Sequence, residues 1–161
     1  MITLNETIEV PRTVEACFRY VADFRTTVEW DATAVKARKV TRGPVGLGSR
    51  FALVCRAGPT AIALTYSIDE FTPWQCLVLT GKSRWFTVKD VITFEPVGHS
   101  STRITYTAHF EYRYGLEAIA SRNETALRKM GKVSLRGLAK ALADDNPSPS
   151  ALPETKRKDS N

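Results

Sequence analysis

The sequence predicts an α+β protein in which a seven-stranded antiparallel sheet is followed by one long C-terminal helix. From Ala34 to Tyr112 apolar and polar residues alternate with a period of two, which is typical of strands with one buried face. The turns between these strands are short, and short turns favour antiparallel pairing of strands that follow one another in the chain. Gly115–Ala143 instead carries its apolar residues at helical spacing.

The first thirty residues predict a strand and two short helices. Residues 2–10 mix β-branched and apolar side chains and form the strand, which Pro11 ends. Thr13 is suited to cap a first short helix, and Asp23 a second one that ends near Trp30.

Six further strands are predicted after this opening. They are Ala34–Thr41, Ser49–Arg56, Thr60–Phe71, Cys76–Thr80, Thr87–Glu95 and Ser101–Tyr112. Glycine and proline mark the turns, at Gly43-Pro44, Gly58-Pro59, Pro73, Gly81 and Pro96–Gly98. In Ser49–Arg56 both faces fit the core, the one with Phe51 and the one with Arg50.

Residues 115–143 form either one helix or a short helix that leads into a long one. Its apolar face consists of Leu116, Ile119, Ala120, Leu127, Met130, Leu138 and Ala141. Small residues lie among them, including Gly131, Ser134 and Gly137, so this helix either sits very close to the sheet or leaves space for a ligand. The opposite face is basic, with Arg128, Lys132, Arg136 and Lys140. It is a solvated face or a surface that docks on anionic membrane lipid.

We expect one domain over residues 1–143 and a disordered tail over residues 144–161, because the tail is polar and rich in proline. The N-terminus has no signal-peptide pattern, and the three cysteines Cys17, Cys55 and Cys76 are scattered. These features favour the cytoplasm. The apolar fraction of 43% and charged fraction of 25% are those of a globular protein, and no apolar run is long enough to span a bilayer.

The chain carries few residues for cofactor or nucleic-acid chemistry. His99 lies in a predicted turn and His109 on the polar face of its strand. Neither is spaced from other ligand-type residues as metal ligands are, and neither can be paired by spacing with a nucleophile and a carboxylate. We therefore expect no metal and no organic cofactor. The net charge is +6, but no RNA-stacking motif or recognition helix accompanies it, which disfavours nucleic acid as a partner.

Asp90 is a candidate polar group on the inner face of the sheet. By alternation it shares a face with Ile92 and Phe94, where a carboxylate would need a partner such as Arg50 or a tyrosine. The alternative is that Asp90 lies in water at the open end of its strand.

Several segments, in their order along the chain, resemble the polyketide cyclase/dehydrase and START-related lipid-transfer superfamily. They are VEACFRYVAD at Val14–Asp23, Trp30, GPVGLGSRF at Gly43–Phe51, YSIDEFTP at Tyr66–Pro73 and ITFEPVGHSSTRITY at Ile92–Tyr106. The resemblance covers about residues 2–143. It implies the helix-grip fold, in which a curved sheet wraps around the C-terminal helix and apolar molecules bind between them.

This resemblance implies a carrier or receptor for a hydrophobic small molecule such as a lipid, isoprenoid or polyketide. The expected ligand-binding residues are Trp30, Phe51, Ile62, Leu64, Tyr66, Ile92, Phe94, Tyr106, Phe110, Leu127, Met130 and Ser134. One alternative is a cyclase or dehydratase without metal, whose candidate catalytic residues are Arg50, Asp90, Tyr66 and Tyr106. A second alternative is a protein-interaction module that uses the basic helix face.

Overall fold

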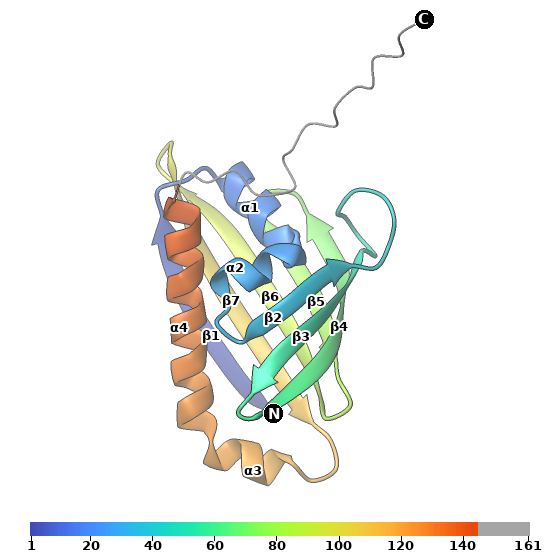
Figure 1. The fold of residues 1–161 in the computed structure, drawn as a ribbon. Coiled ribbons are helices and arrows are strands. Elements are labelled where there is room, and N and C mark those ends of the chain that lie inside the picture. Colours follow the sequence, from blue (N-terminus) through green and yellow to red (C-terminus); the bar gives the residue numbers. More distant parts are fainter. Residues whose placement is uncertain (145–161) are drawn as a thin grey trace, which may run out of the picture.

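The computed structural model describes residues 1–144 and confirms the α+β fold (Figure 1). The elements are β1 (Ile2–Val10), α1 (Val14–Ala22), a 3-10 helix (Phe24–Thr26), α2 (Thr27–Trp30), β2 (Ala34–Lys39), β3 (Arg50–Ala57), β4 (Thr60–Thr72), β5 (Cys76–Lys82), β6 (Phe86–Val97), β7 (Ser101–Tyr112), α3 (Glu117–Arg122) and α4 (Glu124–Ala143). The tail predicted for residues 144–161 lies outside the described residues except for Asp144.

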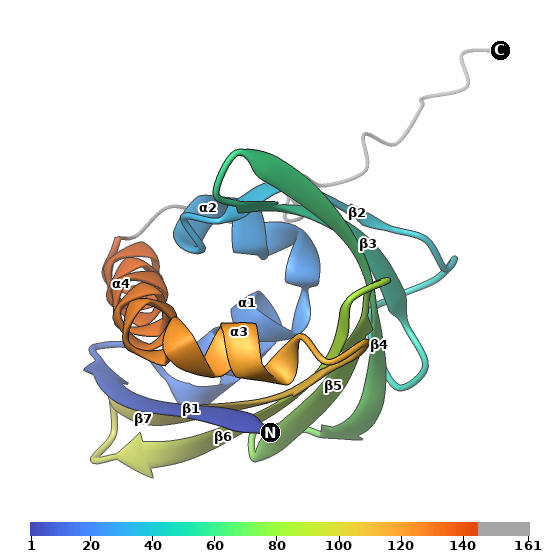
Figure 2. The ribbon, with the colours of Figure 1, turned by 90° about the horizontal axis from the view of Figure 1, so that it is seen from below.

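The seven strands form one antiparallel sheet in the order β1-β7-β6-β5-β4-β3-β2. Sequential strands pair through short turns, and β1 then adds beside β7, so β1 and β2 are the two edges. Figure 2 shows the sheet curving around the interior, with α4 between the β1 edge and α2. Helix α4 packs on β1 on one side and on α2 on the other. Helices α2 and α4 together therefore bridge the open side of the curved sheet.

Side-chain caps fix the short helices where the sequence predicts them. Thr13 Oγ1 accepts a hydrogen bond from the Ala16 amide at 3.3 Å at the start of α1. Asp23 Oδ1 accepts from the Arg25 amide at 3.1 Å, and the Arg25 guanidinium donates to both Asp23 carboxylate oxygens. Near the C-terminus the helix breaks at Asn123, which separates α3 from α4.

A packed core fills the part of the sheet that α1 covers. The Phe18 ring of α1 lies with its centroid 5.2 Å from that of Phe94 and 5.0 Å from that of Phe71, in edge-to-face contacts. Phe51 and Leu53 of β3 are buried here, which settles the orientation of that strand.

One expectation about a single residue is wrong, and the predicted apolar face of α4 is only partly buried. Gly81 does not form a turn but lies within β5, and the chain turns after it at Ser83–Trp85. The buried residues of α4 are Ser134, Leu135, Leu138 and Leu142, whereas Met130 of the predicted face is 41% exposed. Only the C-terminal half of α4 is packed tightly, because its N-terminal half stands over a cavity.

Candidate functional site

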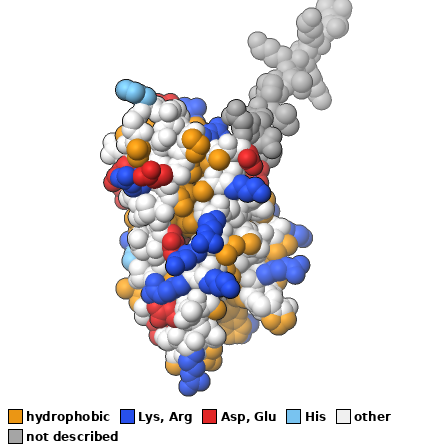
Figure 3. Space-filling model, turned by 90° about the vertical axis from the view of Figure 1, so that its left-hand side faces the viewer, with side chains coloured by type: hydrophobic (Ala, Val, Ile, Leu, Met, Phe, Trp, Pro, Cys, Tyr) orange, Lys and Arg blue, Asp and Glu red, His pale blue; other side chains and the backbone are white. Residues whose placement is uncertain are grey.

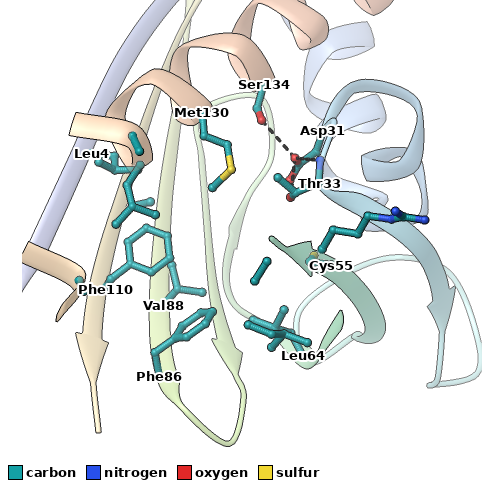
Figure 4. Close-up of a pocket in the computed structure, with 18 of the residues that line it drawn as sticks. Leu4, Asp31, Thr33, Cys55, Leu64, Phe86, Val88, Phe110, Met130 and Ser134 are labelled. Carbon is teal, nitrogen blue, oxygen red and sulfur yellow. Dashed lines mark hydrogen bonds between the residues drawn. The ribbon is translucent and has the colours of Figure 1, made fainter. Parts of the chain in front are cut away.

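A cavity of about 830 Å³ lies between the inner face of the sheet and the helices α3 and α4. Its wall is mainly apolar, with Leu4, Ile62, Leu64, Phe86, Val88, Ala108, Phe110, Leu116, Leu127 and Met130 among the lining residues. Figure 4 shows Met130 of α4 facing Phe110, Val88 and Phe86 across this space. A cavity of this size with a few polar groups in an apolar wall is typical of a small-molecule site.

The cavity ends where three strands of the sheet, β4, β6 and β7, change from lining residues to core residues. Because side chains alternate along a strand, inward positions follow one another at every second residue. On β6 the inward series runs Phe86, Val88, Asp90 along the cavity and then Ile92, Phe94 in the core. The same change falls between Tyr66 and Ile68 on β4 and between Tyr106 and Ile104 on β7. Tyr66, Asp90 and Tyr106 therefore form one layer, which we call the cavity floor.

Asp90 is buried at this floor and is paired with a tyrosine. It is 3% exposed, and its Oδ2 accepts a hydrogen bond of 2.9 Å from the Tyr106 hydroxyl. Burial raises the pKa of Asp90 to about 7; the Tyr106 hydrogen bond opposes this rise and the charge of Asp31 adds to it. The sequence alternative in which Asp90 lies in water is wrong. This carboxyl group can change its charge near neutral pH.

Tyr66 supplies a hydroxyl group that has no hydrogen-bond partner among residues 1–144. Its ring lies where a side chain at Gly81 would be, since a Cβ added there would stand 2.6 Å from the ring. Burial, followed by the charge of Asp90, raises the pKa of Tyr66 well above its ordinary value. Tyr66 therefore stays a neutral hydrogen-bond donor at the floor.

Trp30 and Asp31 join the cavity wall to α4. The Trp30 carbonyl oxygen lies 2.3 Å from the position of a Cβ at Gly137, so only glycine permits this close approach of α2 and α4. Asp31 Oδ1 accepts hydrogen bonds from Ser134 Oγ at 3.1 Å and from the Thr33 amide at 2.9 Å (Figure 4). The indole Nε1–H of Trp30 is buried without a partner among residues 1–144.

The end of the cavity opposite the floor is bordered by exposed residues. Trp85 precedes β6 and is 42% exposed, Ile119 of α3 is 56% exposed, and Arg56 at the end of β3 is also exposed. All three line the cavity, so we take this end as its mouth. Trp85 and Tyr114 stack edge to face beside it, with ring centroids 6.4 Å apart.

The structure brings together most of the residues named from the sequence. Those that line the cavity are Trp30, Ile62, Leu64, Tyr66, Asp90, Tyr106, Phe110, Leu127, Met130 and Ser134. Phe51, Ile92 and Phe94 do not line it, because they lie beyond the floor in the packed core. Arg50 is exposed, is absent from the lining, and does not partner Asp90.

Other lining residues were missed by the sequence analysis. Glu6, Asp31, Cys55 and Val88 are among them. Inward alternation on β6 could have indicated Val88, as it placed Ala108 of β7 on the inner face, whereas Asp31 follows a helix end and shows no periodic signal. Burial, with the charge of Asp31, raises the pKa of Cys55 to about 11, so its thiol is not activated.

The histidines lie away from the cavity. His99 is exposed in the turn between β6 and β7, as predicted. His109, on the predicted polar face of its strand, is only partly exposed, and its Nδ1 lies 3.0 Å from the Thr3 hydroxyl of the neighbouring strand.

The curved sheet, the long helix and the cavity between them define the helix-grip fold. The chain belongs to the family described as polyketide cyclase/dehydrase and lipid transport, whose family model matches residues 1–144. No curated protein matches the sequence.

Solved structures with this fold come from several bacteria. A START superfamily protein from Mycobacterium smegmatis superposes with a TM-score of 0.69 at 17% identity, covering 89% of this chain and 95% of that one. A protein from Thermus thermophilus gives 0.74 at 14% identity, with 87% and 96% covered. The Zhui aromatase/cyclase from a Streptomyces species gives 0.64 at 13% identity, with 90% and 98% covered. At these identities the likeness shows the shared fold.

Within the described part of the chain, no helix has the length and apolar character needed to cross a membrane.

Proposed function

We propose that this protein is a cytoplasmic carrier or receptor that binds a lipid, isoprenoid or polyketide in the cavity between its sheet and α4. The observation that carries the proposal is the cavity itself, about 830 Å³ with a mainly apolar wall. Family membership supports the same function, because the family description names polyketides and lipid transport.

Native mass spectrometry of the protein as purified from cells tests this function. We expect an adduct in the wild type, released by solvent extraction, and none in Ala108→Phe, whose ring would occupy the cavity. Ala63→Phe is the matched control, since Ala63 is exposed and lies outside the lining. A wild-type protein with no adduct and no uptake of the neutral dye Nile red would contradict the proposal and favour the protein-interaction alternative.

A cyclase or dehydratase activity is the second candidate, and the Asp90–Tyr106 pair favours it. A carboxyl group with a pKa of about 7 can both take and return a proton at neutral pH, and it stands in the cavity beside two phenols. The test is to incubate the extracted molecule with wild type and with Asp90→Asn. With wild type only, a dehydratase would release water from the molecule and a cyclase would convert it to an isomer of different chromatographic retention, whereas a carrier would leave both mass and retention unchanged.

Docking on an anionic membrane belongs to the carrier function and is likewise proposed. Arg128, Lys132, Arg136 and Lys140 are basic residues of α4 that reach its outer surface, and Arg128 is paired with Glu124. Lys and Arg side chains gather on the molecular face that carries α4 (Figure 3). Such a patch is attracted to anionic lipid by about 1 kcal/mol per basic side chain near the surface.

Vesicle sedimentation tests this docking. We expect binding to phosphatidylglycerol vesicles that falls when Arg128 and Lys132 are both replaced by Glu. Replacing Lys36 and Arg38 of β2 by Glu changes the net charge equally and leaves α4 intact, so this control should bind as wild type does. Equal losses in both double variants would mean that only net charge matters.

A further inference from the structure

The charge of the cavity is opposite in sign to that of the whole protein. The chain has a net charge of +6, yet the charged residues that line the cavity are Glu6, Asp31 and Asp90 against Arg56 alone. Arg56 is exposed at the mouth, so no lysine or arginine among the described residues lines the cavity near its floor. The ligand thus meets an excess of carboxyl groups after it passes the mouth.

The floor offers one donor and one acceptor to a ligand. The Tyr106 hydroxyl already donates its proton to Asp90 Oδ2, which leaves Asp90 Oδ1 without a side-chain partner among residues 1–144. The Tyr66 hydroxyl, also without a partner there, supplies a free donor. A hydroxyl group both donates and accepts, so it can satisfy Asp90 and Tyr66 together.

An anionic group at the same place would be repelled. In an apolar cavity the attraction or repulsion between charges is only weakly screened, and an unpaired buried charge is costly. Asp90 and Asp31 would both oppose a carboxylate or phosphate at the floor, and neither the floor nor the apolar wall formed by residues 1–144 provides a cation to compensate.

We propose that the cavity selects apolar molecules whose inserted end is an uncharged hydroxyl group, such as an alcohol or a phenol, and rejects carboxylates and phosphates. This inference rests on the proposed function and names the chemical class of its ligand. It distinguishes lipid alcohols and phenols from free fatty acids, which would fit the apolar wall equally well.

Competition with bound Nile red tests this selectivity with ligands of one chain length: decanol, decanoate and decylamine. Because decanol enters any apolar site more readily than decanoate does, the decisive quantity is the ratio of their affinities in wild type relative to Asp90→Asn. At about pH 8, where Asp90 is ionised, we expect this ratio to fall roughly tenfold in Asp90→Asn. Asp144→Asn is the matched control, since Asp144 is exposed outside the cavity, and it should keep the wild-type ratio.

A second measurement needs only the wild-type protein. The decanol preference should grow between about pH 6 and about pH 8, because Asp90 ionises in that range while decanoate is charged throughout. The titratable groups that interact with Asp90 are the Tyr106 and Tyr66 phenols, whose pKa values are both raised, and the Asp31 carboxyl.

Each outcome is decisive. An unchanged ratio in Asp90→Asn, or a preference that does not grow with pH, would overturn the selectivity for uncharged ligands. Decylamine that binds more tightly than decanol would overturn it in favour of cationic ligands. If neither Nile red nor any of the three compounds binds, the proposed function fails and the selectivity fails with it.

Discussion

The Asp90 carboxyl group links the stability of this protein to pH. Its pKa rises from an ordinary value of 3.8 to about 7 because the folded protein buries it. At a pH between these two pKa values, folding is therefore accompanied by the uptake of a proton. The stability gained in this way is fully present below about pH 4 and is lost as the pH rises through 7.

Replacing Asp90 by Asn should remove this pH dependence. We expect the free energy of unfolding of wild type to fall relative to that of Asp90→Asn by a few kcal/mol between about pH 4 and about pH 8. Urea denaturation of both proteins across this range measures the difference. A constant difference would mean that Asp90 titrates alike in the folded and unfolded states.

The Tyr66 ring occupies the space that a side chain at position 81 would fill, so this position needs glycine. In Gly81→Ala the new Cβ would stand 2.6 Å from the Tyr66 ring and 2.9 Å from Val88 Cγ1, so the ring must move. We expect a loss of about 1–3 kcal/mol in the free energy of unfolding, the usual cost of an overpacked site, and weaker Nile red binding.

Gly46→Ala is the control for this substitution, because nothing lies within 4 Å of a Cβ there and its φ is not positive. Chemical denaturation should leave it close to wild type. Equal losses in the two variants would show that the Tyr66 contact is not the cause.

Alternation along the strands predicted the side of the sheet on which the site lies, but not how far the cavity extends. Asp90, Ile92 and Phe94 share one inner face, and only Asp90 lines the cavity. The sequence does not show how much of the sheet α1 covers, because this depends on how the helix packs in the tertiary structure. Asp31 was missed for a related reason, since its role depends on the approach of Ser134 from a distant helix.

At the scale of elements, α4 is held at its C-terminal half and spans the cavity with its N-terminal half. Leu135, Leu138 and Leu142 are buried, whereas Leu127 and Met130 line the cavity. The sequence predicted a helix here and left open whether a short helix precedes the long one. It placed Met130 on the same apolar face as Leu138, because helical periodicity alone cannot tell a packed contact from a cavity wall.

Gly137→Ala should separate α4 from α2. The added Cβ would stand 2.3 Å from the Trp30 carbonyl oxygen, a backbone atom that cannot turn aside. We expect a loss of roughly 2 kcal/mol or more, despite the better helix propensity of alanine, in thermal or urea unfolding.

Gly131→Ala is the matched control on the same helix. Its Cβ would meet only Leu4 Cδ1, at 3.4 Å, so the gain in helix propensity should leave the protein as stable as wild type or slightly more so. Two variants of equal stability would contradict the close contact of α4 with α2.

At the scale of the whole molecule, the two ends of the sheet are packed differently. Under α1 its inner face is filled by the rings of Phe18, Phe71 and Phe94, and under α3 and α4 it encloses the cavity. The fold class, the antiparallel pairing of sequential strands and the helix-grip arrangement could be predicted because alternation, turns and the resemblance agree. The volume of the cavity could not be predicted, because it is the difference between the volume that the sheet and helices enclose and the volume that the side chains fill.

This division has a consequence for the response of the protein to hydrostatic pressure. Compression favours states that eliminate internal voids, and the void here is concentrated at one end of the sheet. The α3–α4 end should therefore become disordered at lower pressure than the end under α1. A molecule that fills the void would remove that weakness, so pressure resistance offers a label-free measure of how much of the protein is occupied.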